Sequence, residues 1–284
     1  MIIKNQFKIS MLNKLLAVFG LIFLLSACQN DKLIKRGDTL QVAYQKAMAF
    51  YMEEDYTEAA NAFDTVTRLG RGTDYGQEAQ YYLADSYYKN QQYLLAASEY
   101  DRFVSLYPND ERRQEAEFKA AMSYYHQSPR YKLDQSATRN AIERFQLFNN
   151  RYPDSELVTE SADKIDELRN KLARKTYEAA QFYVRTDQYL AATIYLEETI
   201  DQYPESEWAE KALVDLIKTY VTYADNSVPE RQEERYSKAV DTYDKFLQLF
   251  PESTYRSEVE NIHDEAQRKL EDVQGSMISE SNNN

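Results

Sequence analysis

Few side chains in this sequence are of the types that carry out acid–base, metal or nucleophilic chemistry. Its 284 residues include two histidines, His126 and His263, and one cysteine. His126 lies at the end of a predicted helix, His263 lies among acidic residues, and neither has a second ligand at a spacing typical of a metal site. The sequence also lacks the glycine-flanked serine of a hydrolase and the glycine-rich loop of a nucleotide site. We therefore predict that the chain is not an enzyme and uses no metal and no cofactor.

The single cysteine, Cys28, ends a segment with the features of a secretion signal. Three lysines and no acidic residue precede an apolar run over residues 15–25. This run is shorter than the roughly 20 residues needed to span a bilayer. The order Leu-Ser-Ala-Cys then resembles the bacterial lipobox, which implies cleavage before the cysteine and acylation of its thiol, for example with palmitate. We predict a signal peptide over residues 1–27, lipid attachment at Cys28 and a lipidated linker over residues 28–37. An ordinary signal peptide with a chance cysteine is the alternative, and Met11 could serve as the start in place of Met1.

The charge of the chain argues against one class of partner. Acidic residues outnumber basic residues 47 to 34, which gives a formal net charge of −13. Because nucleic-acid-binding proteins carry an excess of lysine and arginine, no nucleic acid is expected as a partner. The acidic excess is concentrated in residues 156–284, with 28 acidic and 15 basic side chains. This half could attract a basic partner, or it could be a solvated acidic surface.

Four steps of an aromatic residue followed by proline divide the sequence into segments of similar length, with prolines 45, 51 and 47 residues apart. Proline cannot continue a helix interior, and an Asp or Ser after it can cap the next helix, so each step predicts the end of one helix and the start of another. An alanine lies 12 residues before each proline and a larger side chain lies 8 before it, which places both on one helical face. An earlier copy of this frame has Ala59 and Phe63 but no proline. The other alanines are Ala96, Ala141, Ala192 and Ala239, and the larger side chains are Tyr100, Phe145, Leu196 and Tyr243.

This alternation of small and large side chains over about 34 residues resembles the tetratricopeptide (TPR) repeat, in which pairs of helices stack on one another. Five copies cover most of residues 38–255. The predicted fold is therefore all-α: a solenoid of about five TPR-like helix-turn-helix repeats with a long central helix and a C-terminal capping helix. An unrelated helical bundle is the alternative.

One irregularity in the spacing predicts the domain organisation. Residues 156–184 contain neither proline nor glycine and could form one helix about 44 Å long, at 1.5 Å per residue. This long connecting helix would divide an N-terminal TPR module of three repeats, over residues 38–155, from a C-terminal module over residues 185–273. The C-terminal module would hold two repeats and the capping helix. The polar segment 274–284 is predicted to be a disordered tail.

Tyrosine is unusually frequent in the chain, with 25 copies, and several copies fall where the first helices of such a solenoid line its concave face. Tyrosine offers a large contact area at low entropic cost, so an aromatic groove with a few polar groups suits an extended peptide. The alternative is that these tyrosines pack only against neighbouring helices. The predicted peptide groove consists of Tyr44, Met48, Tyr51, Tyr81, Asp85, Tyr88 and Lys89.

The lipobox, the short linker, the five repeats, the Tyr-Pro steps and the long dividing helix together resemble the BamD (ComL-like) family of outer membrane β-barrel assembly lipoproteins. The resemblance covers essentially the whole chain after residue 27. It implies a lipid-anchored scaffold on the outer membrane that faces the periplasm, within the β-barrel assembly (BAM) machinery. It also implies that the N-terminal repeats contact unfolded outer membrane proteins and that the C-terminal repeats dock onto a BamA-like barrel subunit and accessory lipoproteins.

Two other functions fit the same sequence features. One is a TPR lipoprotein adaptor for a periplasmic protease or peptidoglycan enzyme, which would co-purify with a hydrolase. The other is a glycan-capture lipoprotein, which would bind sugars in solution.

Overall fold

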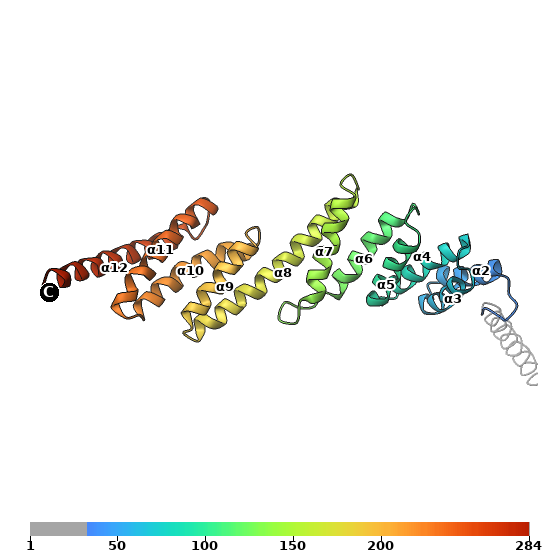
Figure 1. Cartoon of the computed structure of the whole chain (residues 1–284), viewed down its shortest axis with the longest axis horizontal. Coiled ribbons are helices and arrows are strands. Elements are labelled where there is room, and N and C mark those ends of the chain that lie inside the picture. Colours follow the sequence, from blue (N-terminus) through green and yellow to red (C-terminus); the bar gives the residue numbers. More distant parts are fainter. Residues whose placement is uncertain (1–32, 284) are drawn as a thin grey trace, which may run out of the picture. The chain divides into compact units, whose positions relative to one another are not determined.

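The computed structural model describes residues 33–283, and every regular element in this range is an α-helix (Figure 1). Within residues 33–127 and within residues 128–283, each helix packs mainly against its neighbours along the chain, and first helices also contact the first helix of a neighbouring repeat, as α2 does with α4 and α8 with α10. This is the contact pattern of stacked helical hairpins, so the predicted all-α solenoid is confirmed. The helices are α2 (Leu40–Met52), α3 (Tyr56–Leu69), α4 (Asp74–Lys89), α5 (Tyr93–Leu106), α6 (Arg113–Gln127), α7 (Ser136–Arg151), α8 (Leu157–Arg185), α9 (Tyr189–Gln202), α10 (Glu207–Asp225), α11 (Pro229–Leu249) and α12 (Arg256–Asn283).

The predicted membrane attachment falls at the start of the chain. The signal peptide over residues 1–27 and the lipid-attachment residue Cys28 both lie outside the described residues. Within residues 33–283, no helix combines the length and the apolar character that crossing a membrane requires.

Each aromatic–proline step ends a helix, as predicted. The aromatic residue is the C-cap, with φ between −126° and −136°, and its N–H donates to the carbonyl four residues earlier. The proline that follows has no N–H to donate, so the helix cannot continue. These C-caps are Tyr107, Tyr152, Tyr203 and Phe250.

The predicted alanine frame is buried between helices. All five alanines are 0% exposed, and so are four of the five larger side chains four residues later. The fifth, Tyr243, packs at the edge of the core. Because alanine has only a methyl group, two helices can approach closely there, and the larger side chain fills the space beside it. The alanines are Ala59, Ala96, Ala141, Ala192 and Ala239.

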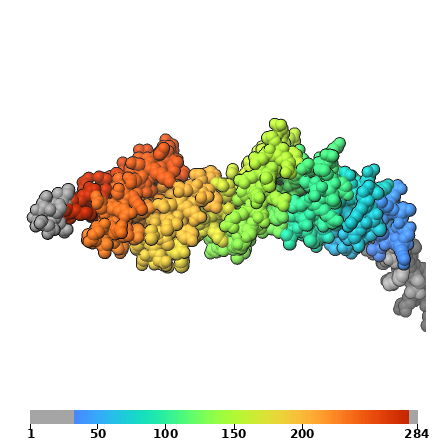
Figure 2. All heavy atoms as spheres, viewed as in Figure 1, coloured from blue at the N-terminus to red at the C-terminus, as the bar shows by residue number. Residues whose placement is uncertain are grey.

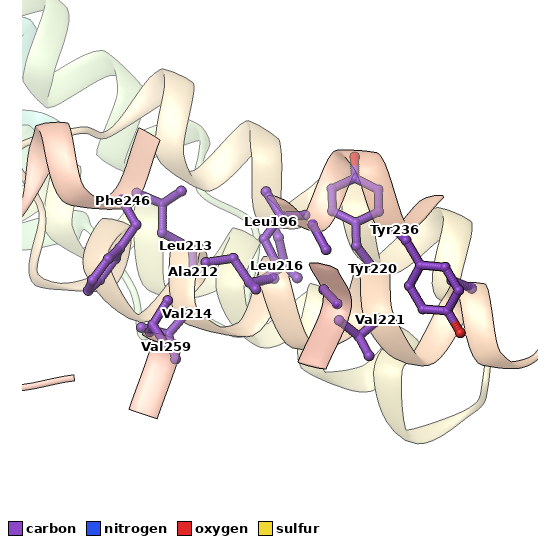
Figure 3. Packing of buried hydrophobic residues seen from close by; sticks show 14 of the residues in the cluster. Leu196, Ala212, Leu213, Val214, Leu216, Tyr220, Val221, Tyr236, Phe246 and Val259 are labelled. Atoms are coloured by element: carbon purple, nitrogen blue, oxygen red, sulfur yellow. The ribbon is translucent and has the colours of Figure 1, made fainter. Parts of the chain in front are cut away.

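The described residues form two compact units that divide after Gln127, residues 33–127 and residues 128–283, which we call unit 1 and unit 2. Unit 1 holds α2–α6, and its core combines alanines with aromatic rings. Unit 2 holds α7–α12, and its core includes Leu196, Leu213 and Phe246 from three successive helices (Figure 3). In the space-filling view, side chains close the spaces between the helices of each unit (Figure 2).

Two predicted boundaries differ from the structure. The long connecting helix is present as α8, with 29 residues, but the chain divides after Gln127 rather than near residue 155. The predicted module boundary at residue 155 concerns which segment folds independently, so it stays a prediction. The predicted tail is helical in the structure, because α12 continues past Val273 to Asn283. This segment contains no proline, and its one glycine, Gly275, has open space around it, so nothing in the sequence stops the helix there.

Candidate functional site

The seven residues of the predicted groove lie on two neighbouring first helices of unit 1, three on α2 and four on α4. Two of them are buried: Tyr81 is 6% exposed and Asp85 is 2% exposed. Lys89, the last residue of α4, is exposed. The other four are half-buried, namely Tyr44, Met48, Tyr51 and Tyr88.

Asp85 is the centre of a hydrogen-bond network that joins α2, α4, α5 and α6. Its carboxylate accepts hydrogen bonds from the hydroxyl groups of Tyr51 and Tyr100, the second at 2.7 Å. The ammonium group of Lys119 lies 2.7 Å from the same carboxylate and also donates to the Tyr81 hydroxyl, at 3.2 Å. A buried carboxylate without partners would cost several kcal/mol, so these contacts are what allow an acid in the core. Three of the predicted groove residues thus belong to one network, in which Tyr81 and Asp85 are buried and Tyr51 is half-buried.

The network keeps both of its charged groups ionised. Burial by itself would raise the pKa of Asp85, but the ion pair with Lys119 and the tyrosine hydrogen bonds outweigh burial and hold this pKa below its usual 3.8. Burial by itself would lower the pKa of Lys119, but Asp85 and Glu115, which is 2.8 Å away, raise this pKa instead. Burial and the Asp85 carboxylate also raise the pKa of Tyr51. No group of the network is therefore poised to exchange a proton near neutral pH, which fits a structural role rather than acid–base catalysis.

Arg112, just before α6, extends this network along the Tyr81 ring. Its guanidinium group lies 4.6 Å from the centre of that ring. It also pairs with Glu78 through two hydrogen bonds of 2.7 and 2.9 Å, and with Asp110 at 2.9 Å. The arginine holds the pKa of Asp110 down at about 2. A planar cation bound on its edge by carboxylates and on its face by a ring fixes the orientation of Tyr81.

The half-buried residues form the part of the site that a ligand could touch. Tyr44 packs against the rings of Phe63 and Tyr75, with centroid distances of 6.1 and 5.4 Å, and burial raises its pKa to about 12. Tyr88 lies 3.3 Å, hydroxyl to Nε2, from His126. His126 in turn stacks on Tyr93 at 4.5 Å. The accessible surface of this site is therefore aromatic, with Lys89 next to Tyr88 as its cation.

Sequence reasoning missed Lys119, Tyr100 and Arg112. Lys119 lies 34 residues after Asp85, and Asp85 lies 34 residues after Tyr51, so one repeat length separates successive members of the network. That spacing was the signal available in the sequence. The second unit repeats it, because Gln181 donates to Asp215, 34 residues later, at 2.7 Å.

The site offers no centre for metal chemistry. Among the described residues, no group of three or more His, Cys, Asp or Glu side chains is placed to hold a metal ion. What the arrangement can do is present aromatic surface from rigid helices, a property suited to binding rather than to reaction.

Comparison with known proteins identifies the family. A family model described as an outer membrane lipoprotein, YfiO, matches residues 37–235, which is well over half of the chain. The outer membrane protein assembly factor BamD of Caulobacter vibrioides is 30% identical over 98 residues, 34% of this chain and 32% of that protein. BamD of Xylella fastidiosa is 29% identical over 99 residues, 33% of this chain and 34% of that protein. The chain thus aligns with about a third of the length of these curated relatives.

Two solved structures that match the chain are described as TPR proteins. A TPR repeats protein from Bacteroides fragilis has a TM-score of 0.44 and 14% identity, and the match covers 81% of this chain and 98% of that protein. The P58(IPK) TPR domain has a TM-score of 0.39 and 16% identity, covering 83% and 66%. The family match, which extends from α2 into α11, confirms the predicted family: the chain belongs to the YfiO family of outer membrane lipoproteins.

Proposed function

We propose that this chain is a lipid-anchored scaffold subunit of the machinery that assembles β-barrel proteins in the outer membrane, where it faces the periplasm. The observation that carries the proposal is the family match over residues 37–235, supported by relatives named as outer membrane protein assembly factors. The proposed partners are a BamA-like barrel subunit, accessory lipoproteins and unfolded outer membrane proteins.

The proposed anchor is the acylated thiol of Cys28. It rests on the Leu-Ser-Ala-Cys sequence and on the lipoprotein character of the family. Replacing the cysteine, Cys28→Ala, removes the acceptor of the lipid, so we expect the variant to lose fatty-acid labelling and to leave the outer membrane fraction. Normal labelling and normal membrane recovery of this variant would disprove the anchor.

The proposed substrate site is the accessible aromatic surface of unit 1. The chain end of a barrel protein that finishes in an aromatic residue would place its ring against Tyr44, Met48 and Tyr88, and its terminal carboxylate beside Lys89. Tyr51, Tyr81 and Asp85 would support this surface from below, because they are tied to Lys119 and Tyr100. Affinity should be micromolar or weaker, since an unfolded peptide loses conformational freedom on binding.

The test measures fluorescence anisotropy of a labelled peptide with an aromatic C-terminus. We expect the double change Tyr88→Ala with Lys89→Glu to weaken binding about tenfold, because it removes one ring contact and reverses one charge. The control makes the same kind of change in unit 2, Tyr189→Ala with Arg185→Glu, and should bind the peptide as the parent does.

Co-purification from detergent-solubilised membranes tests the second half of the proposal. Docking to the BamA-like subunit is assigned to the C-terminal repeats, so the unit 1 variant should retain this partner. If the unit 1 variant keeps the peptide and loses the partner, the two roles are assigned to the wrong units. If the tagged parent chain recovers a protease or a peptidoglycan enzyme and no barrel subunit, the proposed function is wrong.

A further inference from the structure

Unit 2 contains a pocket that the proposed function does not use. It has a volume of about 410 Å³ and lies between the loop before α7, the middle of α8 and the first turn of α10. Two aromatic rings, Tyr131 and Trp208, form part of its wall. The volume falls in the range typical of ligand sites, which is about 300–1,000 Å³.

The pocket concentrates positive charge in the more acidic half of the chain. Three cationic side chains, Arg130, Lys171 and Arg174, line it together with two carboxylates, Glu167 and Glu207. The ammonium group of Lys171 donates to the Ser128 hydroxyl at 2.8 Å and forms no ion pair with a carboxylate of the described residues. The guanidinium group of Arg174 lies over the rings of Tyr131 and Trp208, at 4.3 and 5.4 Å from their centres. Arg174 also forms a partly exposed ion pair with Glu178 at 3.8 Å, so Lys171 is the cation of the pocket that is more available to an anionic ligand.

Two buried polar atoms at this pocket have no hydrogen-bond partner among the described residues: Trp208 Nε1 and Asn170 Oδ1. The amide nitrogen of Asn170 donates to Glu207 at 2.9 Å, which orients the carboxamide. Such unpaired groups are rare in proteins and cost about 1–3 kcal/mol each. The side chain of Arg174 is 46% exposed and lies over the indole, and a ligand would reach these atoms if this side chain moved aside.

The chemistry of these two atoms selects the ligand. The indole N–H can only donate, and the carboxamide oxygen can only accept. A peptide group carries one acceptor and one donor, so it can satisfy both atoms at once. A free, ionised carboxylate only accepts hydrogen bonds, and it would leave Asn170 Oδ1 unpaired.

We propose that this pocket binds an extended, acidic segment of a partner polypeptide. A backbone peptide group of the segment pairs with Trp208 Nε1 and Asn170 Oδ1, and an adjacent acidic side chain lies between Lys171 and Arg174. The inference goes beyond the proposed function, because it concerns a different unit and an internal acidic segment rather than an aromatic chain end.

The chain supplies its own probe for this pocket. Trp208 is the only tryptophan in the sequence, so its emission reports on the pocket alone. We would titrate the purified chain with a blocked, tryptophan-free peptide of alternating glutamate and threonine and follow the emission of Trp208. The comparison peptides replace every glutamate with glutamine or with lysine. We expect saturable binding of the glutamate peptide below about 1 mM, about tenfold weaker binding of the glutamine peptide and none of the lysine peptide.

Variants separate the two parts of the recognition. Asn170→Leu keeps the size of the side chain but removes the acceptor, so it should weaken binding of the glutamate peptide about tenfold. Lys171→Met should abolish the preference for glutamate over glutamine. The matched control is Lys245→Met, an exposed lysine of α11 in the same unit, which should leave both properties unchanged. Helical circular dichroism and melting temperature confirm that each variant is folded.

Three results would overturn the proposal. The first is the absence of any change in Trp208 emission with the glutamate peptide. The second is equal binding by the parent and the folded Asn170→Leu variant, which would mean that no backbone hydrogen bond is made. The third is displacement of the peptide by glutarate at the same concentration, which would make the pocket a small-anion site. The tests of the proposed function use unit 1 and membrane co-purification, so either proposal can fail without the other.

Discussion

At the scale of single residues, the two units solve the same packing problem differently. In unit 1 the buried Asp85 is neutralised by an ammonium group 2.7 Å away. In unit 2, Asp215 accepts from the neutral groups of Tyr177 and Gln181, at 2.6 and 2.7 Å, and its nearest lysine is 3.8 Å away. The contrast makes unit 1 more dependent on one charge pair.

Replacing the central acid by its amide, Asp85→Asn, should destabilise unit 1 by about 3 kcal/mol, because it leaves a partly buried lysine with one anionic partner fewer. Chemical denaturation followed by far-ultraviolet circular dichroism measures this loss. The control Asp241→Asn, at an exposed position of α11, should change the free energy of unfolding by about 0.5 kcal/mol at most. Parent-like stability of the Asp85 variant would mean that the charge pair contributes nothing.

The ion pair of Asp85 also predicts how the stability of the fold depends on pH. The pKa of Asp85 is lower in the folded chain than its usual 3.8, so the ionised group stabilises the fold above about pH 4, and this contribution disappears as the pH falls through the lowered pKa. The parent should therefore lose stability on acidification below pH 4 more steeply than Asp85→Asn does. Parallel curves for the two proteins would contradict the charged network.

Sequence reasoning selected Tyr51, Tyr81 and Asp85 as a group but assigned them to an open groove. A tyrosine or aspartate on the inner face of a first helix has the same spacing whether it meets solvent or a charge on the next repeat. The choice depends on Lys119, which does not belong to the frame of small and large residues and pairs with Asp85 from the next repeat. Burial of these side chains could not be predicted without the structure.

At the scale of helices, the turn within a repeat has a recurring strained residue. Glu54, Gln91 and Asp187 have φ of 61°, 58° and 56°, although none is glycine. Each follows a first helix, and the residue after each donates its N–H to a carbonyl five residues back, as Gln92 does to Tyr87 at 2.8 Å. This is the hydrogen bond of a Schellman motif, whose left-handed position favours glycine.

Glycine at such a position should therefore stabilise the chain. For Glu54→Gly or Gln91→Gly we expect the free energy of unfolding to rise by about 0.5–1 kcal/mol. Glycine relieves the strain of the left-handed conformation, and this gain exceeds the cost of the greater entropy of glycine in the unfolded chain. The control Gln45→Gly, at an exposed position inside α2, should cost about 1 kcal/mol. Thermal unfolding distinguishes them, and a loss of stability at Glu54 and Gln91 would show that their side chains matter more than the strain.

The alanine frame is the feature that the sequence predicted best. An alanine and a larger side chain four residues apart must lie on the same face of a helix, so the spacing alone identifies the buried face. Ala96 is 0% exposed where α5 packs on its neighbours, so Ala96→Leu should overpack this crossing and cost about 1–3 kcal/mol. Ser98→Leu adds a leucine at an exposed position of the same helix and should be nearly neutral. Equal melting temperatures for the two variants would mean that the packing at Ala96 can relax.

At the scale of the whole molecule, the sequence predicted the number of repeats but not where the chain divides. The third predicted repeat consists of α6 and α7. In the structure α6 belongs to unit 1 and α7 belongs to unit 2. The loop between them, residues 128–135, is an insertion relative to the three-residue turns inside the other repeats. Within unit 2, α7 packs against α8, and the Ser161 hydroxyl donates to the carbonyl of Phe145 at 3.4 Å. Repeat spacing carries no information about which neighbour a helix packs on more tightly.

Two fragments distinguish the predicted boundary near residue 155 from the division after Gln127. A fragment of residues 33–127 contains α2–α6 with both cores of unit 1 and the complete Asp85 network, so we expect it to unfold cooperatively. A fragment of residues 33–155 adds α7 without α8, the helix that covers Phe145 and Phe148 in the full chain. We expect the same unfolding midpoint for both fragments and fast amide hydrogen exchange throughout α7 of the longer one. If α7 is instead protected as strongly as α6, the three-repeat module is the folding unit, and the insertion at residues 128–135 does not interrupt the array.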